Sequence, residues 1–315
     1  MKIIYNMSTQ QIENLVLEAS KKAAIESYKF IGKGDSNAAD QAAVEAMRSV
    51  LKNQDIISAK VVIGEGERDV APMLFIGEEL GSGSVKMEIA VDPLEGTSLC
   101  ANNQRNSITA IAIGNGILHA PDLYMEKIAS LSGSEEVLDL DKTIEENIRD
   151  LSELLDKKIS EITVVMLDRQ RHKEYIERIR KIGAKVSLIS DGDLSAVMRS
   201  AIGDGVDLYF GIGGAPEGVL AACALKTLGG FMQARLVSGT KEVNERSSSM
   251  GVDFAKKYHI EDMVSGDVVF GITGVTDGDF CNGVQKSDNE IITHSILLNS
   301  KNKTQKTIEE IAFVD

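Results

Sequence analysis

The chain has 315 residues, of which 43% are hydrophobic and 26% are charged, a composition typical of a globular protein with a sizeable core. Its 48 acidic residues outnumber its 34 basic ones and give a formal net charge of −14, so we expect no nucleic-acid partner. No apolar run approaches the ~18 residues that a membrane-spanning helix needs, so we expect no membrane partner either.

The N-terminus and the cysteines bear on the cell compartment. The first residues lack the apolar core and the cleavage site of a secretory signal. Cys100, Cys223 and Cys281 are odd in number and widely spaced, which argues against a disulfide framework and for a reducing compartment. We interpret them as buried apolar residues. A cytoplasmic protein is therefore expected.

Helices are predicted at the start of the chain and strands after them. Residues 8–31 have the pattern of an amphipathic helix that glycines end, and a second helix runs from about Asp40 to Leu51. Strand-like runs then recur. They are Lys60–Ile63, Met87–Val91, Ser107–Ile113, Ile162–Leu167, Lys185–Ile189, Val206–Gly211, Val268–Thr273 and Ile291–Leu298.

A charged stretch over residues 132–161 suggests a domain boundary near residue 157. Before it, strands and helices mix without regular alternation, which predicts an α+β domain over residues 1–157; the carboxylate motifs described below would make it the metal-binding domain. After it, strands alternate with helices as in βαβ units, which predicts an α/β domain over residues 158–315; the candidates for phosphate recognition described below would make it the substrate-binding domain.

The strongest single motif is the segment Ile89–Thr97. An apolar strand delivers Asp92 to its carboxyl end, a proline interrupts the ladder, and Glu95 follows, so both carboxylates can converge on one hard cation. Gly96 allows a close approach of backbone to ligand, and Thr97 offers a hydroxyl to orient a water. The alternative is an Asp-Pro turn with a capping role.

Two further sources of carboxylates precede this motif. Glu65 and Glu67 stand between glycines directly after an apolar strand, where packing explains them poorly; the alternative is a solvated turn. Asp40 shares one helical face with apolar residues as far as Leu51, and a carboxylate there is costly unless it is paired or binds metal. The alternative interpretation is that Asp40 is an acid in the first turn of the helix, where the helix dipole favours a negative charge.

The second half supplies candidates for phosphate recognition. Ser190–Asp193 follows one predicted strand, and Gly211–Gly218 follows another and opens a helix, where free amides and glycines favour an anion. Glu217, at that helix start, could cap the helix or reach a cation. Arg169 and Arg171 follow a third strand and are forked donors for a phosphate, unless they are ordinary surface arginines.

Other site chemistries lack their motifs. The sequence contains no C-x-x-C and no H-E-x-x-H, and its four histidines are far apart, which argues against a zinc site of nitrogen or sulfur ligands. There is no G-x-S-x-G elbow for acyl transfer and no Walker A sequence. An oxygen-ligand site for Mg²⁺ or Mn²⁺ fits the carboxylates.

Taken together, these motifs resemble those of the class II fructose-1,6-bisphosphatases. The matching segments run in order through nearly the whole chain. They are Asp40, Gly64–Glu67, Asp92–Thr97, Ala120–Lys127, Asp191–Asp193 and Gly213–Gly218. Asp92–Thr97 alone resembles the wider lithium-sensitive phosphatase superfamily, which includes the inositol monophosphatases. Ala120–Lys127 and Gly213–Gly218 narrow the resemblance to class II.

The resemblance implies a layered sugar-phosphatase fold, an α+β half followed by an α/β half with a mixed sheet and the site between them. It implies two or more divalent ions, one held by Asp40 and Glu65 and another by Asp92, Glu95 and Glu217. Implied sugar-bisphosphate contacts are Glu95, Gly96, Thr97, Tyr124, Arg169, Gln170, Arg171, Asp191, Gly192, Asp193 and Gly214. The chain departs from the family at Gln170, where proline is usual, and at Ser98–Cys100.

The expected reaction is hydrolysis of the C1 phosphate of fructose 1,6-bisphosphate to fructose 6-phosphate and phosphate, a gluconeogenic step. We assign Thr97 and Glu65 to orient and deprotonate the attacking water. The alternatives are a sedoheptulose-1,7-bisphosphatase or dual enzyme, and a non-catalytic sugar-phosphate-binding regulator. A homo-oligomer, either a dimer or a tetramer, is also expected.

Overall fold

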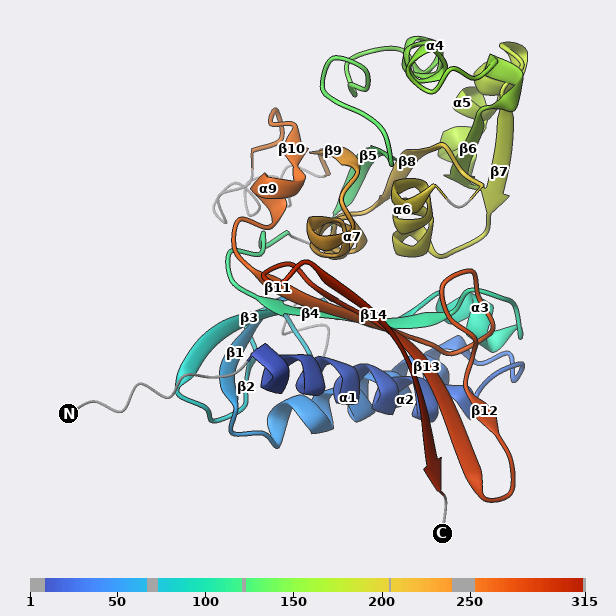
Figure 1. Ribbon diagram of the computed structural model, residues 1–315. Helices are drawn as coiled ribbons and strands as arrows, with labels where there is room; N and C mark the ends of the chain where they lie inside the picture. The colour runs from blue at the N-terminus through green and yellow to red at the C-terminus, as the bar shows by residue number, and fades with distance from the viewer. Residues whose placement is uncertain (1–8, 67–72, 121–122, 204, 240–252, 314–315) are drawn as a thin grey trace, which may run out of the picture. The chain divides into compact units, whose positions relative to one another are not determined.

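A computed structural model describes residues 9–66, 73–120, 123–203, 205–239 and 253–313 (Figure 1). The chain divides into two compact units, one formed by residues 1–117 and 266–315 and the other by residues 118–265. No helix in the described ranges is long and apolar enough to cross a membrane.

The first unit is a mixed sheet with two helices along one face (Figure 1). The strand order is β12-β13-β11-β4-β3-β1-β2, and β14 pairs with β13. The strands are β1 (Ile57–Ile63), β2 (Glu79–Leu80), β3 (Val85–Glu95), β4 (Ile108–Gly114), β11 (Val268–Gly274), β12 (Gln285–Lys286), β13 (Glu290–Asn299) and β14 (Thr304–Phe313). The helices are α1 (Thr9–Tyr28), α2 (Ser36–Lys52) and the short α3 (Thr97–Ala101). β1 and β3 run parallel, and the other neighbours are antiparallel.

The two long helices pack closely because their buried faces are rich in small residues. Ala19 and Ala23 of α1 and Ala39 and Ala43 of α2 are all fully buried in one core with the sheet. On β11, a Cβ at Gly271 would lie 2.5 Å from Cγ1 of a valine of α1, so glycine there lets the helix approach the sheet. This packing holds α2, and with it Asp40, firmly against the sheet.

The second unit is a mixed sheet with helices on both faces (Figure 1). Its strand order is β10-β9-β5-β8-β6-β7. The strands are β5 (Tyr124–Ser130), β6 (Thr163–Leu167), β7 (Lys185–Ile189), β8 (Leu208–Gly214), β9 (Phe231–Leu236) and β10 (Tyr258–His259). The helices are α4 (Ile144–Leu154), α5 (Lys173–Lys181), α6 (Asp193–Ile202), α7 (Ala215–Leu228), α9 (Ile260–Met263) and the 3₁₀ turns η1 (Ile159–Glu161) and η2 (Gln170–His172). β6 is parallel to β7 and β8, whereas β5 is antiparallel to β8 and β9.

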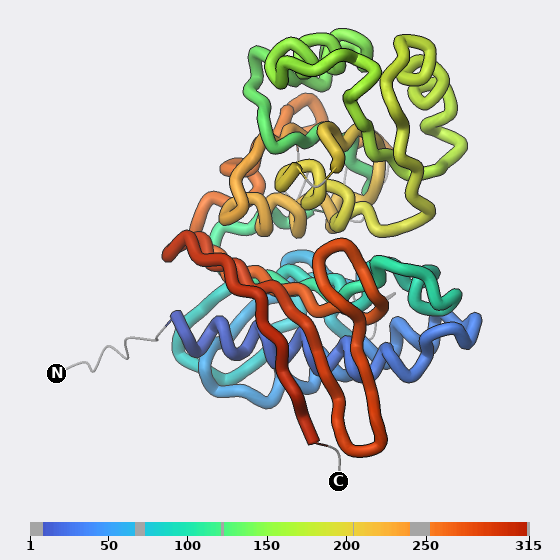
Figure 2. The backbone as a smooth tube through the Cα atoms, turned by 45° about the vertical axis from the view of Figure 1, so that its right-hand side comes forward, coloured from blue at the N-terminus to red at the C-terminus, as the bar shows by residue number. Residues whose placement is uncertain are grey.

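The predicted fold class, mixed α and β with a mixed sheet in the second unit, is confirmed, but the chain is not divided at residue 157. Residues 118–157 supply β5 and α4 to the second unit, and residues 266–315 return to the first (Figure 2, where the red segment lies among blue and cyan elements). The reason is non-local pairing, since β11 pairs along its length with β4. A boundary based on local composition cannot detect such a return.

Burial of the three cysteines, predicted from the sequence, is confirmed. Desolvation raises the pKa of Cys100 to about 11 and that of Cys281 to about 12, and it raises the pKa of Cys223 as well. Because the folded-state pKa values exceed the ordinary thiol value, the stability that these thiols contribute is complete below pH ~9 and is lost as pH rises through the folded-state values.

We therefore expect the native thiols to be inert to a thiol-specific reagent at pH 8, and all three to react once the chain is unfolded. The measurement is the time course of labelling with and without denaturant. Rapid labelling of any cysteine in the native protein would contradict its burial, and mass spectrometry of the labelled peptides would identify it.

Candidate functional site

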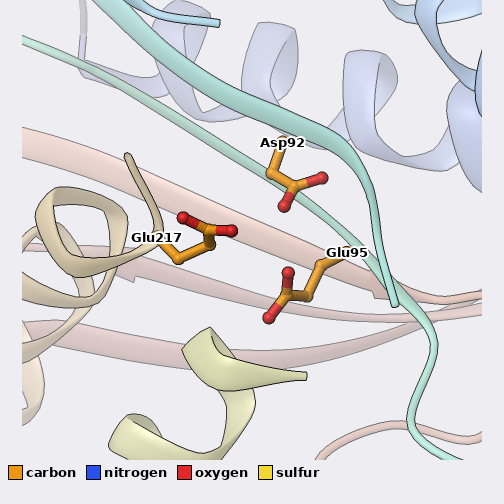
Figure 3. A group of neighbouring side chains, drawn as sticks. All are labelled: Asp92, Glu95 and Glu217. Atoms are coloured by element: carbon orange, nitrogen blue, oxygen red, sulfur yellow. The ribbon is translucent and has the colours of Figure 1, made fainter. Parts of the chain in front are cut away.

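β3 turns Asp92 and Glu95 to the same side because a bulge interrupts it. In a regular strand, residues three apart point to opposite faces. Here Asp92 lies opposite Ala110 of β4 but Glu95 lies opposite Ile108, so β3 has one extra residue, which reverses the facing of the residues after it. Figure 3 shows the two carboxylates turned toward a common space, and each offers an oxygen within 4.8 Å of the other's.

The bulge contains Pro93, which has no N–H to give to a ladder and is therefore tolerated at this position. The carboxylate of Asp92 accepts the N–H of Leu94 at 3.1 Å and fixes the turn. Glu95 is only 4% exposed. Two neighbouring carboxylates, one of them buried, repel each other and lose hydration, and a bound divalent cation offsets both costs. The donor set thus fits a divalent metal ion that prefers oxygen ligands.

Gly96 and Thr97 continue from this pair. Gly96 has φ +78° and caps α3, a left-handed conformation that glycine adopts without strain, and a Cβ there would lie 2.9 Å from Leu99. Thr97 is the first residue of α3. The chain therefore places a carboxylate and a hydroxyl on the two sides of a sharp turn, two residues apart in the sequence.

Asp40 and Glu65 lie on other elements of the first unit. Asp40 is half-buried on α2, and because the helix starts at Ser36, it is not a first-turn acid. Desolvation raises the pKa of its carboxyl. Glu65 follows β1, where its N–H donates to the carbonyl of Leu74 at 3.1 Å. In the described part of the chain, neither residue belongs to a group of three or more convergent metal ligands, and Glu67 lies outside that part.

In the second unit, Tyr124 and Arg171 come together. The guanidinium of Arg171 lies 4.6 Å from the centre of the Tyr124 ring, and its Nε and Nη2 donate to the carbonyl of Ile212 at 2.9 and 2.7 Å. Tyr124 remains 54% exposed. Arg169 instead donates to the carbonyl of Asp168. Arg171 therefore has a fixed position, as a phosphate anchor requires, and Gln170 lies beside it in η2.

The other two predicted substrate segments begin α6 and α7. Gly192 has φ +90° and caps α6, and the Asp191 side chain accepts the Gly192 N–H at 3.2 Å. Glu217, also labelled in Figure 3, lies in the first turn of α7, and its carboxylate rests against Gly214, where a Cβ would collide with it. An acid in this turn also interacts favourably with the helix dipole.

Sequence reasoning missed a buried polar group beside these segments. The carboxylate of Asp193 accepts hydrogen bonds from Lys127 Nζ and from the hydroxyl of Tyr209. His172 Nδ1 contacts the Leu167 carbonyl at 2.7 Å. The signal in the sequence is weak, because Lys127 follows Glu126 in a strand that is not uniformly apolar, although a lysine is rarely buried unless it is paired.

Comparison with known proteins assigns the family. The chain matches the model of the family described as bacterial fructose-1,6-bisphosphatase, glpX-encoded, over residues 10–312. It is 43% identical over 314 residues to fructose-1,6-bisphosphatase class 2 of Haemophilus influenzae, with 94% of each chain covered. It is 40% identical over 314 residues to fructose-1,6-bisphosphatase 1 class 2 of Escherichia coli, covering 94% of this chain and 93% of the other.

Two further proteins are similar to this chain. A Synechococcus protein named D-fructose 1,6-bisphosphatase class 2/sedoheptulose 1,7-bisphosphatase is 40% identical over 330 residues, with 95% of each chain covered. A solved inositol monophosphatase from Anabaena (Nostoc) has 13% identity and a TM-score of 0.32 over 61% of this chain and 71% of its own, too low to establish a common fold. From the match over residues 10–312 and the high coverage at 40–43% identity, the chain belongs to the bacterial, glpX-encoded fructose-1,6-bisphosphatases.

Proposed function

We propose that this protein hydrolyses the C1 phosphate of fructose 1,6-bisphosphate and releases fructose 6-phosphate and phosphate, a gluconeogenic step. The observation that carries the proposal is the pair of convergent carboxylates that the bulge in β3 creates at Asp92 and Glu95. An acidic pair of this kind, with Glu95 buried and Asp92 partly buried, suits a metal-assisted phosphatase. The names of the relatives support the substrate.

The proposed ligands are Asp40 and Glu65 for one ion and Asp92, Glu95 and Glu217 for another, with Mg²⁺ or Mn²⁺ as the metal. When bound, such ions lower the pKa of water and neutralise phosphoryl oxygens. They also offset the electrostatic repulsion between a chain of net charge −14 and a doubly phosphorylated substrate.

The chain's own residues then orient and activate the nucleophile. The hydroxyl of Thr97, held by the turn at Gly96, orients the attacking water. The carboxylate of Glu65 accepts its proton as the oxygen approaches phosphorus. No covalent intermediate on a protein side chain is needed, since water itself attacks.

The second phosphate is held by Tyr124, Arg171 and their neighbours Arg169 and Gln170. Two guanidinium nitrogens of Arg171 are committed to the Ile212 carbonyl, which fixes the planar group without cancelling its charge. The remaining proposed sugar and phosphate contacts are Glu95, Gly96, Thr97, Asp191, Gly192, Asp193 and Gly214.

The direct test is phosphate release from fructose 1,6-bisphosphate in the presence of Mn²⁺. We expect turnover that excess chelator abolishes and that Mg²⁺ or Mn²⁺, but not Zn²⁺ alone, restores, because every proposed ligand is an oxygen. Full turnover in chelator, or restoration by zinc alone, would contradict the site. Tight binding of the bisphosphate without phosphate release would indicate the non-catalytic regulator.

The dual bisphosphatase remains a second candidate because a Synechococcus relative carries both activities in its name. The ratio of kcat/KM for sedoheptulose 1,7-bisphosphate to that for fructose 1,6-bisphosphate decides between them. The homo-oligomer, dimer or tetramer, and the cytoplasmic location stay predictions. Light scattering of the purified protein measures the first of these.

Arg171→Ala is expected to raise KM for fructose 1,6-bisphosphate at least about tenfold, because a charge-assisted hydrogen bond contributes ~1.5–3 kcal/mol. The slow hydrolysis of inositol 1-phosphate, which has no second phosphate, should barely change. Arg180→Ala, at an exposed position of α5, is the matched control and should behave as wild type. Equal kcat/KM for the bisphosphate and the monophosphate in the wild type would contradict a bisphosphate anchor.

A further inference from the structure

The proposed substrate segments of the second unit share one buried polar support. These segments lie at or directly after the carboxyl ends of β6, β7 and β8 and contain Arg171, Asp191–Asp193 and Gly214. Beneath them lie Lys127 and Tyr209, both 0% exposed, on the face of the sheet that packs against α6 and α7. Neither side chain takes part in the proposed hydrolysis.

Lys127 bridges the starts of the two helices. Its Nζ donates to the Asp193 carboxylate at the first residue of α6 and to the carbonyl of Gly214, the cap of α7, at 2.9 Å. Tyr209 donates its hydroxyl to the other oxygen of Asp193. Burial and the neighbouring carboxylate raise the pKa of Tyr209, so the hydroxyl stays protonated and remains a donor.

His172 follows Arg171 in η2 and connects the Arg171 segment to β8. The N–H of Ile212 on β8 donates to His172 Nε2 at 2.9 Å, so this nitrogen carries no proton and Nδ1–H donates to the Leu167 carbonyl. Burial lowers the pKa of His172, in agreement with a neutral ring. Since Arg171 also donates to the Ile212 carbonyl, both polar groups of this one residue hold the Arg171 turn.

Glycines make the space that this support occupies. A Cβ at Gly213 would collide with the Asp193 carboxylate, and one at Gly211 would lie 3.3 Å from the His172 ring. A Cβ at Gly218 would lie 2.5 Å from Met125 and 3.2 Å from Lys127. Gly211, Gly213 and Gly218 therefore leave room for the side chains of the buried polar group.

A buried ion pair is costly to desolvate, and a well-packed apolar pair of similar volume often gives equal or greater stability. Stability alone thus gives little reason for a lysine, an aspartate and a tyrosine at these positions. What they supply, and apolar side chains would not, is directed hydrogen bonds that join the starts of α6 and α7 to β5 and β8.

We propose that Lys127 and Tyr209 are positioning residues, which fix Asp193 and the Gly214 carbonyl and so set the spacing of the substrate-contacting segments. On this proposal Asp193, whose two oxygens are bonded to Lys127 and Tyr209, acts as part of the support and touches the sugar phosphate with its backbone at most. The inference rests on the proposed function for the identity of the ligand, fructose 1,6-bisphosphate.

The test compares Tyr209→Phe, Lys127→Met and the double variant Lys127→Met/Asp193→Asn with wild type. Lys127→Met leaves a buried carboxylate without its cation and is expected to unfold at lower temperature; the double variant removes both charges and should regain most of that loss. Each variant is measured for Tm, for kcat and KM, and for calorimetric binding of fructose 1,6-bisphosphate in excess chelator.

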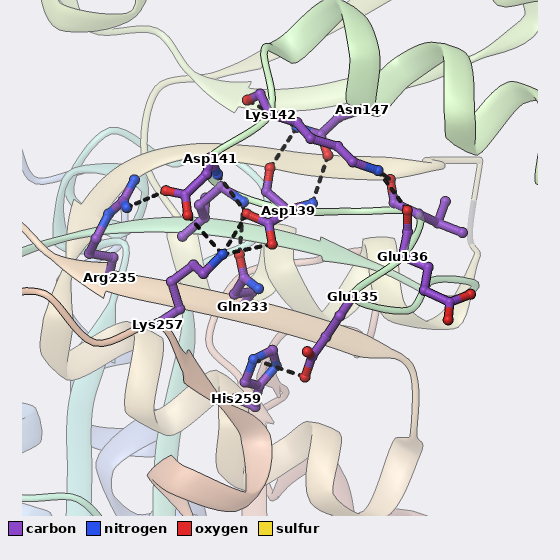
Figure 4. Close-up of polar contacts among 12 residues, drawn as sticks. Glu135, Glu136, Asp139, Asp141, Lys142, Asn147, Gln233, Arg235, Lys257 and His259 are labelled. Atoms are coloured by element: carbon purple, nitrogen blue, oxygen red, sulfur yellow. Dashed lines mark hydrogen bonds and ion pairs between the residues drawn. The ribbon is translucent and has the colours of Figure 1, made fainter.

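We expect about a tenfold weaker binding in Tyr209→Phe and on the order of 100-fold lower kcat/KM in both Lys127 variants. In the double variant the binding defect should persist although Tm recovers, because the Gly214 carbonyl still lacks its donor. The control is Lys257→Met, which removes the ion pairs to Asp139 and Asp141 on the same unit (Figure 4) and should leave KM unchanged.

The proposal would be overturned if Tyr209→Phe and the double variant both bound the bisphosphate with wild-type affinity and showed wild-type KM. It would also be overturned if KM of the double variant recovered together with its Tm. Because binding is measured in excess chelator, the outcome of this test does not depend on whether the protein hydrolyses the bisphosphate. A wild-type protein that binds the bisphosphate without hydrolysing it refutes the phosphatase function, whereas the positioning role is still decided by the ratio of binding constants.

Discussion

Asp92→Asn and Glu95→Gln are each expected to lower kcat by at least about 10³-fold, because each removes a charged ligand where charge must be neutralised in the transition state. The fold should survive both changes. Asn and Gln keep the shape and an acceptor oxygen, and the Asp92 oxygen that accepts the Leu94 N–H has an equivalent in Asn. Without metal, loss of one charge relieves repulsion within the pair, so the metal-free Tm should stay constant or rise.

The measurement combines phosphate release at saturating Mn²⁺ with thermal unfolding in chelator. Glu88→Gln is the matched control, because Glu88 lies on the same strand and uses its carboxylate to accept the Ile117 N–H at 2.8 Å, away from the pair. It should retain wild-type turnover. Wild-type kinetics in either ligand variant would refute the metal assignment, and a large loss of metal-free stability would instead indicate a structural turn.

The convergence of Asp92 and Glu95 could be anticipated from the sequence because its determinants are local, and their role as metal ligands stays a prediction. An apolar strand, a proline that cannot complete a ladder and a glycine with positive φ all lie within one segment. The sequence could not show how the two carboxylates come to the same side of β3. The bulge is visible only in the register of β3 against β4, two strands whose pairing depends on tertiary contacts.

Non-local contacts explain the parts of the fold that were not predicted from the sequence. The polar residues of β5, Glu126 and Lys127, interrupt its apolar pattern, so this central strand was not predicted. Lys127 is buried only because Asp193 and Gly214 come to it from distant parts of the chain. The return of β11 and β13 to the first sheet is of the same kind, since it depends on the pairing of β11 with β4.

The residue at which α2 begins determines whether Asp40 is a first-turn acid. A helix beginning at Asp40 would make it a first-turn acid that the dipole stabilises. Asp35 caps α2 by accepting the Ala38 N–H at 3.0 Å, so the helix begins one turn earlier and Asp40 loses that explanation. A half-buried carboxyl with a raised pKa remains, and its role as a metal ligand stays a prediction.

Thr97→Ala is expected to lower kcat by about 10²-fold or more, while KM for fructose 1,6-bisphosphate changes by less than about threefold. The proposed hydroxyl acts on the attacking water, so it contributes more to the transition state than to binding of the substrate. The substitution should not disturb the fold, because alanine is a good helix former and Gly96, which makes the turn, is retained.

Two further variants separate the effect of the Thr97 hydroxyl from that of the side chain's shape. Thr97→Ser keeps it and should retain most of the turnover, whereas Thr97→Val keeps the branched shape without it and should be as slow as Thr97→Ala. Steady-state kcat and KM at saturating Mn²⁺ measure all three. If Thr97→Val were as active as wild type, the side chain would act by packing. If KM rose while kcat held, Thr97 would be a substrate contact alone, and orientation of the water would have to come from the carboxylates around it.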